Sequence, residues 1–227
     1  MDFIELITRL EKLDTCAVSD ALDSLGVPGV ANGIVRRSTR QIIAGRVRTL
    51  QLAAGKHPDS DAPHLGTRSI KEAADTDVIV LEQRTGINAA CWGGILSEAA
   101  HYKHIRGVVI EGPARDVDEI NATGFPLFSR SITPIAARGR IHEAAFNVPV
   151  DVAGISVEPG DFVIADGSGV VFIPAAIAEE AISEAECIAA KERRMVEAVH
   201  ENKSVTEIMD SKYENLLDRA DRGERDV

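Results

Sequence analysis

The sequence predicts one α/β domain with a mixed β-sheet and helical elements at both ends. Apolar residues recur at helical spacing near the N-terminus and again after Pro174, whereas short β-branched runs fill the middle of the chain. These runs first alternate with helical stretches and later follow one another directly, which favours a mixed sheet. The 227 residues are therefore expected to form one domain over residues 1–210, followed by a charged tail over residues 211–227.

Two helices are expected at the N-terminus. Apolar side chains from Phe3 to Leu13 recur at helical spacing. Asp14 is an N-cap residue type for a second helix, and Gly26 is a residue type that ends helices. The glycine-rich and proline-containing segment 26–33 is then expected to be a loop.

The middle of the chain alternates strands and helices. Its expected strands are the apolar, β-branched runs at residues 42–52, 77–81, 107–110 and 126–133. The polar segment 53–68 is interpreted as a loop because it contains glycine and two prolines. Residues 93–106 and 116–123 are expected to be helices, and Gly124 closes the second one.

Consecutive strands are expected in the last third of the chain. Residues 149–157 alternate between apolar and polar side chains, and a Pro-Gly turn connects them to the apolar run 162–165. The two segments are therefore expected to pair as a hairpin. A second turn leads to a strand at 170–173, and Pro174 opens a long helix that runs to about residue 200.

The composition excludes several classes of function. The formal net charge of −11 disfavours nucleic acids and anionic membrane surfaces, which both attract basic proteins. The sequence contains no apolar run long enough to span a bilayer and no secretory signal at its start. Three widely spaced cysteines offer no disulfide framework, which suits the reducing cytoplasm.

The most informative stretch runs from Trp92 to Asp116. A glycine turn leads into a helix whose first amides, those of Gly94, Ile95 and Leu96, are free to bind an anion. A buried strand follows, and Arg115 and Asp116 come directly after it. In α/β folds ligands bind at the carboxyl ends of such strands, so these features are expected to share one site.

Arginine and aspartate at this position suit a small 2-oxo acid. Arg115 can form two hydrogen bonds with a carboxylate, and Asp116 can hold a hard divalent ion such as Mg²⁺, with water in the other positions. The acid's carboxylate would lie on the helix amides and its carbonyl oxygen on the metal. The spacing alone favours an ordinary salt bridge between Arg115 and Asp116 at the surface, because Arg-Asp pairs are common.

Four separated segments resemble one known family. They are Val18-Ser-Asp-Ala-Leu-Asp-Ser-Leu-Gly26, Ala44-Gly-Arg-Val-Arg-Thr49, Trp92-Gly-Gly through Arg115-Asp116, and Pro149 through Pro174. In order and spacing they are similar to the family that joins the 4-hydroxy-4-methyl-2-oxoglutarate/4-carboxy-4-hydroxy-2-oxoadipate aldolases with the regulators of ribonuclease activity A. The resemblance covers about residues 15–200.

The resemblance implies a fold, an assembly and a set of site residues. The fold would be a swivelling β/β/α domain, assembled as trimers or hexamers with sites between subunits. Arg115 and Asp116 would bind the pyruvate moiety and a divalent metal, with the carboxylate on amides from Gly93 to Leu96. A glutamate that the family takes from a neighbouring subunit would correspond to Glu192.

Two positions depart from the family pattern. The aldolases carry an aspartate where this chain has Gly94, so the side chain that orients a metal-bound water is missing here. The family usually has aspartate where this chain has Glu111, which is either a longer carboxylate behind the site or simply the end of a strand. The departure at Gly94 leaves metal binding intact but leaves the named aldolase reaction open.

The sequence thus predicts a lyase that depends on Mg²⁺, Mn²⁺ or another divalent metal and cleaves a C–C bond of a small 2-oxo acid. Cleavage would be retro-aldol or decarboxylative, and Arg115 would stabilise the pyruvate enolate. One alternative is a non-catalytic, protein-binding regulator, and another is a different reaction on the same scaffold. His64, alone in the loop 53–68, is expected to be merely exposed.

Overall fold

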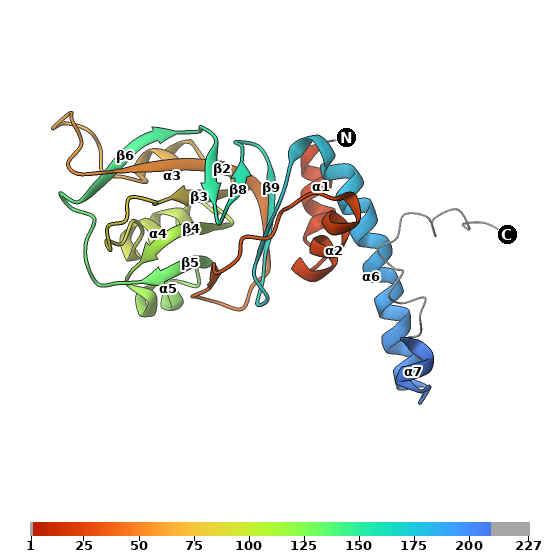
Figure 1. Cartoon of the computed structure of the whole chain (residues 1–227). Helices are drawn as coiled ribbons and strands as arrows, with labels where there is room; N and C mark the ends of the chain where they lie inside the picture. The colour runs from red at the N-terminus through yellow and green to blue at the C-terminus, as the bar shows by residue number, and fades with distance from the viewer. Residues whose placement is uncertain (1, 210–227) are drawn as a thin grey trace.

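The computed structural model describes residues 2–209, so the expected tail over 211–227 lies outside the described residues. Within this range a curled, mixed sheet is covered by helices (Figure 1). Its strands are β1 (Val35–Arg36), β2 (Ile43–Ala54), β3 (Asp77–Glu82), β4 (Gly107–Ala114), β5 (Leu127–Ile132), β6 (Ile141–Phe146), β9 (Phe162–Ala165) and β10 (Val170–Ile173). A separate hairpin consists of β7 (Val150–Val152) and β8 (Ile155–Val157).

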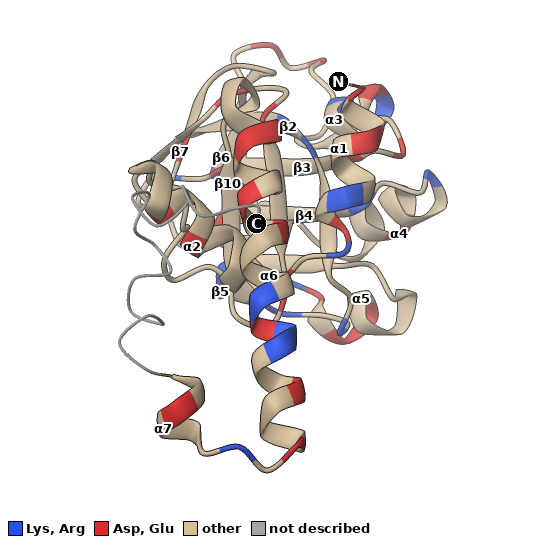
Figure 2. Ribbon diagram, turned by 90° about the vertical axis from the view of Figure 1, so that its right-hand side faces the viewer, with Lys and Arg blue, Asp and Glu red and all other residues tan. Residues whose placement is uncertain are grey.

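Seven α-helices lie within the described residues. The helices are α1 (Phe3–Leu10), α2 (Thr15–Leu25), α3 (Thr67–Glu72), α4 (Gly94–Tyr102), α5 (Val117–Thr123), α6 (Ala178–His200) and α7 (Val205–Ile208), and a 3₁₀ turn at Ala175–Ile177 precedes α6. Helices α1, α2 and α6 pack together at one end of the molecule, and Figure 2 looks onto them. No helix among residues 2–209 is both long enough and apolar enough to cross a bilayer.

The strand order is β1-β5-β4-β3-β2-β9-β10, with β6 also paired to β2. Strands β2 to β5 are parallel neighbours, and α3, α4 and α5 connect them in turn, so the middle of the chain is a run of β–α–β units. The other pairings are antiparallel. The expected α/β domain with a mixed sheet and terminal helices is therefore confirmed.

Alternating side chains along the buried strands separate two layers of the core. In β3, Val78 and Val80 face a cluster that the β7–β8 hairpin closes, whereas Ile79 and Leu81 face α3, α4 and α5. Trp92 and Phe125 stack in the second cluster, with ring centroids 6.4 Å apart. Such period-two alternation fixes the strand register because a one-residue slip would exchange the two faces.

The caps predicted from the sequence are present. The Asp14 side chain accepts a hydrogen bond from the Ala17 amide at 2.8 Å, which begins α2. Gly26 ends that helix with a φ of 68° in the left-handed region, where glycine carries no Cβ penalty.

The hairpin expected between residues 149–157 and 162–165 is wrong. Residues 149–157 fold back on themselves as β7 and β8, because Ala153 and Gly154 both adopt positive φ and reverse the chain. The Pro-Gly turn does form, and Gly160 donates to the Val47 carbonyl at 2.9 Å. It leads from the small hairpin into β9, which pairs with β2 and β10 instead.

Other boundaries also differ from the expectation. The predicted loop 53–68 begins only after Ala54, where β2 ends, and α3 starts inside it at Thr67. Strand β4 continues past residue 110 to Ala114, and β1 and β6 were not expected at all. Strand β6 pairs with the second half of β2, a contact made across a long sequence separation that local pattern does not encode.

Asp166 joins the helical end of the molecule to the sheet. Its carboxylate accepts hydrogen bonds from the Thr15 amide at 3.0 Å, the Thr15 hydroxyl at 2.7 Å and the Ser168 amide at 2.7 Å. Burial raises the pKa of Asp166, but these hydrogen bonds lower it more, so the net pKa lies below the ordinary value.

We expect Asp166→Asn to lower the free energy of unfolding at pH 7 by about 1.5–3 kcal/mol, the contribution of a hydrogen bond to a charged group. A carboxyl whose folded pKa is depressed stabilises the fold above its unfolded pKa and loses that contribution as the pH falls through the folded one. The difference from the parent protein should therefore shrink below about pH 4. Urea unfolding at several pH values measures it, and Asp75→Asn, at an exposed side chain, is the matched control.

Candidate active site

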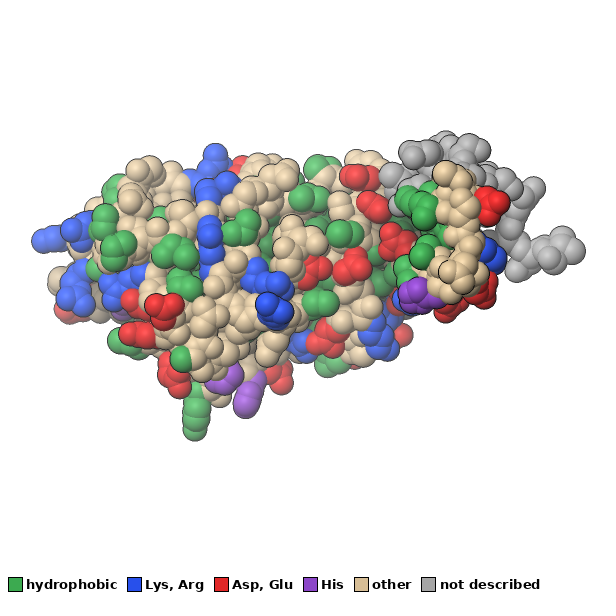
Figure 3. All heavy atoms as spheres, turned by 90° about the horizontal axis from the view of Figure 1, so that it is seen from below, with side chains coloured by type: hydrophobic (Ala, Val, Ile, Leu, Met, Phe, Trp, Pro, Cys, Tyr) green, Lys and Arg blue, Asp and Glu red, His purple; other side chains and the backbone are tan. Residues whose placement is uncertain are grey.

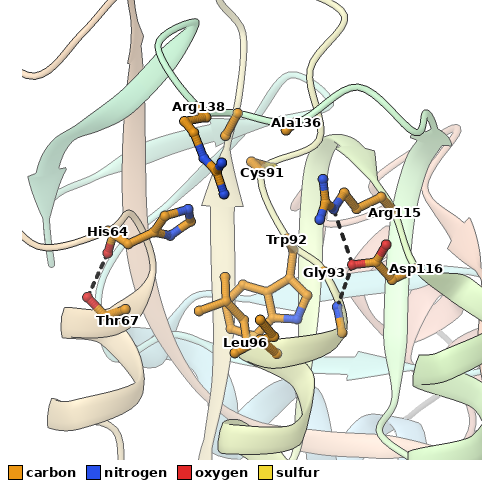
Figure 4. A pocket seen from close by; sticks show the side chains of 13 residues that line it. His64, Thr67, Cys91, Trp92, Gly93, Leu96, Arg115, Asp116, Ala136 and Arg138 are labelled. Atoms are coloured by element: carbon orange, nitrogen blue, oxygen red, sulfur yellow. Dashed lines mark hydrogen bonds and ion pairs between the residues drawn. The ribbon is translucent and has the colours of Figure 1, made fainter.

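A cavity of about 290 Å³ lies where four segments form three walls. One wall is the turn from Cys91 into the start of α4, and a second is the Arg115-Asp116 corner between β4 and α5. The third comes from His64 and Thr67 on one side and the loop over residues 136–138 on the other (Figure 4). The volume is at the low end for small-molecule sites, which are about 300–1,000 Å³, so the cavity suits a small ligand.

Gly93 allows the first two walls to touch. A Cβ atom at this position would lie 2.6 Å from an Asp116 carboxylate oxygen and 3.2 Å from Arg115 Cγ. No side chain other than hydrogen fits there while the Arg115-Asp116 corner keeps its place. The backbone continues the contact, since the Arg115 amide donates to the Trp92 carbonyl at 3.0 Å.

Asp116 occupies a constrained position at the start of α5. Its φ of 58° is in the left-handed region, which is uncommon for residues other than glycine. Its Oδ2 atom accepts hydrogen bonds from the Gly94 amide at 3.0 Å and from Arg115 Nε at 3.2 Å. One carboxylate oxygen is thereby held in place, while Oδ1 makes no hydrogen bond within residues 2–209.

The expected amide site at the start of α4 is reduced by one donor. The Gly94 amide is already bonded to Asp116, so it is not free for a ligand carboxylate. The amides of Ile95 and Leu96 make no hydrogen bond within the described part of the chain, and both residues line the cavity. The helix N-terminus therefore keeps two donors for an anion.

Glu119 fills the space left by the missing side chain of Gly94. Its Oε2 atom lies 2.5 Å from the point that a Cβ on Gly94 would occupy, and Asp116 Cβ lies 3.5 Å from the same point. Glu119 belongs to the first turn of α5. The two carboxyl side chains of this corner thus border one small space beside Gly94.

The acidic donors fit a hard divalent cation. Mg²⁺ prefers carboxylate oxygens and keeps several waters, so it needs few protein ligands. Asp116 offers a carboxylate oxygen without a partner in the described residues, and the Glu119 carboxylate lies beside it. Residues 2–209 contain no group of three or more histidine, cysteine, aspartate or glutamate side chains that could hold a metal. Any ion here would therefore be held mainly through water.

Two further residues named from the sequence lie away from the cavity. Glu111 is buried and pairs with Arg130 at 2.5 and 2.7 Å, and it also accepts a hydrogen bond from the Ala153 amide. The hydrogen bond between Arg130 and the Glu111 carboxylate raises the pKa of Arg130. Glu192 lies on α6, which is at the other end of the molecule from α4 and α5 in Figure 1. Burial raises the pKa of Glu192 most, and the negative charges of Asp14 and Asp20 raise it further.

His64 and Arg138 line the cavity, and Glu119 lies beside Gly94 without lining it; the sequence places none of the three in the site. His64 is exposed, as the sequence predicts, and it also lines the cavity, with its Nδ1 2.9 Å from the Leu65 carbonyl oxygen. Glu119 follows Asp116 by three residues, a helical spacing that could have indicated a shared face. Arg138 gives no local signal, because its loop reaches the site through pairings distant in the chain, those of β6 with β2 and of Ala136 with Ala90.

Gly93→Ala should disrupt the site without unfolding the protein. The added methyl group would displace the Asp116 carboxylate, so we expect the affinity for Mg²⁺ to fall on the order of tenfold or more, as when a supporting contact of a metal ligand is lost. Isothermal calorimetry with Mg²⁺ measures the change. Gly169→Ala is the matched control, since a Cβ there meets nothing within 4 Å. Equal affinities in both variants would contradict the assignment of Asp116 as a ligand.

The chain resembles known proteins along most of its length. Residues 15–172 match the family described as RraA-like, Aldolase/RraA. A putative 4-hydroxy-4-methyl-2-oxoglutarate aldolase of Halalkalibacterium halodurans is 30% identical over 199 residues, which are 88% of this chain and 90% of that protein. Protein DlpA of Legionella pneumophila is 29% identical over 194 residues, or 86% of this chain, but the matched part is only 31% of DlpA.

Solved structures show the same fold. An uncharacterised protein from Pseudomonas syringae pv. tomato superposes with a TM-score of 0.81 at 31% identity, covering 91% of this chain and 98% of that one. Streptomyces coelicolor RraAS2, described as an unusual member of the RNase ES inhibitor RraA protein family, gives 0.74 at 26% identity over 83% of this chain and 94% of its own. The chain that carries the cavity of Gly93, Arg115 and Asp116 therefore belongs to the RraA-like family, described as Aldolase/RraA.

Proposed function

We propose that this protein is a divalent-metal-dependent lyase that cleaves a C–C bond of a small 2-oxo acid by retro-aldol reaction or decarboxylation. The observation that carries the proposal is the placement of Arg115 and Asp116 beside the start of α4 in one small cavity. Relatives named as 4-hydroxy-4-methyl-2-oxoglutarate aldolases, from Halalkalibacterium halodurans and Thermus thermophilus, support the reaction class.

Different groups bind the substrate and stabilise the charge that develops during cleavage. The amides of Ile95 and Leu96 receive the carboxylate of the 2-oxo acid. The Arg115 guanidinium lies beside the carbonyl oxygen, where negative charge grows as the C–C bond breaks. A Mg²⁺ or Mn²⁺ ion held by Asp116 would supply a second positive charge at that oxygen. No lysine is required to form a Schiff base.

The cleavage step requires a proton acceptor as well. In a retro-aldol reaction the hydroxyl group loses its proton, the C–C bond breaks, and its electron pair moves into the enolate, which is then protonated at carbon. We propose that Glu119 provides the carboxylate that Gly94 lacks, because its Oε2 lies beside the empty Cβ position. The alternative that Gly94 makes room for a bulkier substrate is less well supported, since Glu119 already occupies this space.

A non-catalytic regulatory role is the second candidate. The similarity to Streptomyces coelicolor RraAS2 and the net charge of −11 favour a surface that could bind a basic partner. The two roles make different demands on Arg115, because a regulator has no transition-state charge for it to stabilise. Exchange of pyruvate methyl protons with solvent, with and without Mg²⁺, separates them.

We further propose that the protein acts in the cytoplasm as a homotrimer or a dimer of trimers. Its three cysteines are widely spaced in the sequence, which suits a reducing compartment. Apolar side chains near the cavity are left uncovered in the single chain: Ile95 is 89% exposed and Ile132 48% exposed. A second copy covering them would bury this apolar surface, and Glu192 could reach a site only from such a copy.

Light scattering at micromolar concentration tests the assembly. We expect a mass three or six times that of the 24.3 kDa chain. Ile95→Asp should shift the protein toward monomer, because a charge would then be buried without a partner in the interface. Ile42→Asp, at a side chain 48% exposed outside the cavity, serves as the comparison. A monomer in the parent protein would exclude any contribution of Glu192 to a shared site.

Two substitutions test the chemistry. Asp116→Asn should abolish the dependence on Mg²⁺ together with activity, measured as pyruvate proton exchange and as cleavage of 4-hydroxy-4-methyl-2-oxoglutarate.

Arg115→Lys keeps the positive charge but loses the planar guanidinium with its paired donors. The kcat should therefore fall on the order of 10²-fold, with a smaller rise in KM. Full turnover in the presence of a chelator, or an unchanged Arg115→Lys enzyme, would contradict the proposed lyase.

A further inference from the structure

The proposed cleavage leaves one proton transfer without a donor. Breaking the C–C bond leaves pyruvate as its enolate, and the methylene carbon of this enolate must gain a proton before pyruvate is complete. In the proposed lyase Glu119 accepts the proton of the substrate hydroxyl, so a second group is needed for the carbon. That group must face the cavity and must be able to release and regain a proton near neutral pH.

Among the described residues that line the cavity, His64 meets both conditions. Arg115 and Arg138 stay charged in proteins and release no proton. Burial raises the pKa of the Cys91 thiol to about 12, so this thiol keeps its proton at neutral pH. The Asp116 carboxylate already accepts two hydrogen bonds at Oδ2 and is assigned to the metal. An imidazole, in contrast, ordinarily exchanges its proton near neutral pH.

The geometry indicates which nitrogen of His64 is available to a substrate. Nδ1 lies 2.9 Å from the Leu65 carbonyl oxygen. A carbonyl oxygen only accepts hydrogen bonds, so Nδ1 carries a proton and donates it. Nε2 is then the nitrogen that gains and loses the reacting proton. In Figure 4 the ring extends from its loop into the cavity, toward the side on which Arg115 and Asp116 lie.

The loop that carries His64 packs against the start of α4. A Cβ atom on Gly66 would lie 3.3 Å from Leu96 Cδ1 and 3.4 Å from the Trp92 ring, so the backbone of this loop closely approaches both side chains. The Thr67 amide and hydroxyl both donate to the His64 carbonyl, at 3.2 and 2.6 Å. The backbone of His64 is thereby held at one place beside the cavity.

His64 also faces solvent on its other side. A second cavity of about 520 Å³ adjoins the first and shares His64, Ala137 and Arg138 with it. The His64 side chain is exposed. The loop between β2 and α3 lies at the left-hand end of the molecule in Figure 1, and Figure 3 shows charged side chains of both signs at this end. A proton that His64 gives to a ligand can therefore be replaced from water.

We propose that His64 is the acid that protonates the methylene carbon of the pyruvate enolate. This assignment rests on the proposed lyase function. The imidazolium gives its Nε2 proton to the carbon, the electron pair of the enolate forms the new C–H bond, and the ring becomes neutral. Water then returns a proton to the ring, and Glu119 releases the hydroxyl proton to water. A retro-aldol turnover therefore leaves the protonation of the protein unchanged.

Exchange of the pyruvate methyl protons with D₂O isolates this step, because it runs the same proton transfer in both directions and breaks no C–C bond. With saturating Mg²⁺, proton NMR should show that His64→Asn exchanges on the order of 10²-fold more slowly than the parent protein, the usual contribution of a general acid or base. His57→Asn is the matched control. His57 is exposed, belongs to the same loop and lines the second cavity but not the first, so its variant should exchange at the parent rate.

Oxaloacetate distinguishes proton transfer from a merely structural role of the ring. Its C–C cleavage releases CO₂ and leaves the pyruvate enolate, so this bond breaks before any proton reaches the carbon. Release of CO₂ in a single turnover, with protein in excess, should therefore be equally fast in His64→Asn and in the parent protein. A variant that loses CO₂ release together with proton exchange would show that His64 acts in binding or folding, and the assignment would be overturned.

The parent protein tests the lyase itself. If it neither exchanges pyruvate protons nor cleaves oxaloacetate or 4-hydroxy-4-methyl-2-oxoglutarate, the lyase is refuted and the role of His64 with it. If the parent protein is active and His64→Asn exchanges protons equally fast, the assignment of His64 alone is refuted. An equal loss of exchange in His57→Asn would refute it as well, because that side chain does not line the cavity of Arg115 and Asp116.

Discussion

The hydrogen bonds accepted by one oxygen of Asp116 hold the candidate site together. Asp116 Oδ2 accepts one hydrogen bond from the Gly94 amide, at the start of α4, and another from Arg115 Nε, directly after β4. These contacts join two β–α corners that lie side by side only because β3 and β4 are parallel neighbours. Gly93 makes the junction possible, since a Cβ there would lie 2.6 Å from the same oxygen.

This junction also determines what remains available for a ligand. The hydrogen bonds to Asp116 Oδ2 leave Oδ1 without a partner among residues 2–209, and they occupy the amide of Gly94. The amides of Ile95 and Leu96 remain without a partner in the described part of the chain, and the carboxylates of Asp116 and Glu119 lie at the start of α5. The site is thus polarised over a short distance, with donors on α4 and acceptors at the start of α5.

The distribution of charge at this site differs from that of the whole chain. With a net charge of −11, the protein repels small anions over most of its surface. The cavity opens at an end where Arg138, Lys56 and two histidines line the neighbouring hollow. Local charge governs encounter and orientation once a ligand is within about a Debye length, roughly 8–10 Å at moderate ionic strength. An overall acidic composition therefore does not argue against an anionic ligand.

The sequence by itself determined the helices α1 and α2 with their caps at Asp14 and Gly26, the buried strands β3 and β4, and the start of α4 beside Arg115 and Asp116. These features follow from local rules of capping, periodicity and residue order, so a single segment carries the information. Only the tertiary structure decided the pairing of β6 with β2, the separate β7–β8 hairpin, and the presence of His64 and Arg138 in the cavity. It also showed that Glu119 occupies the space beside Gly94. The β7–β8 hairpin depends on the positive φ of the non-glycine residue Ala153, which residue type does not indicate. The other features depend on contacts between residues distant in the chain or on side-chain packing in space, and neither leaves a periodic trace in the sequence.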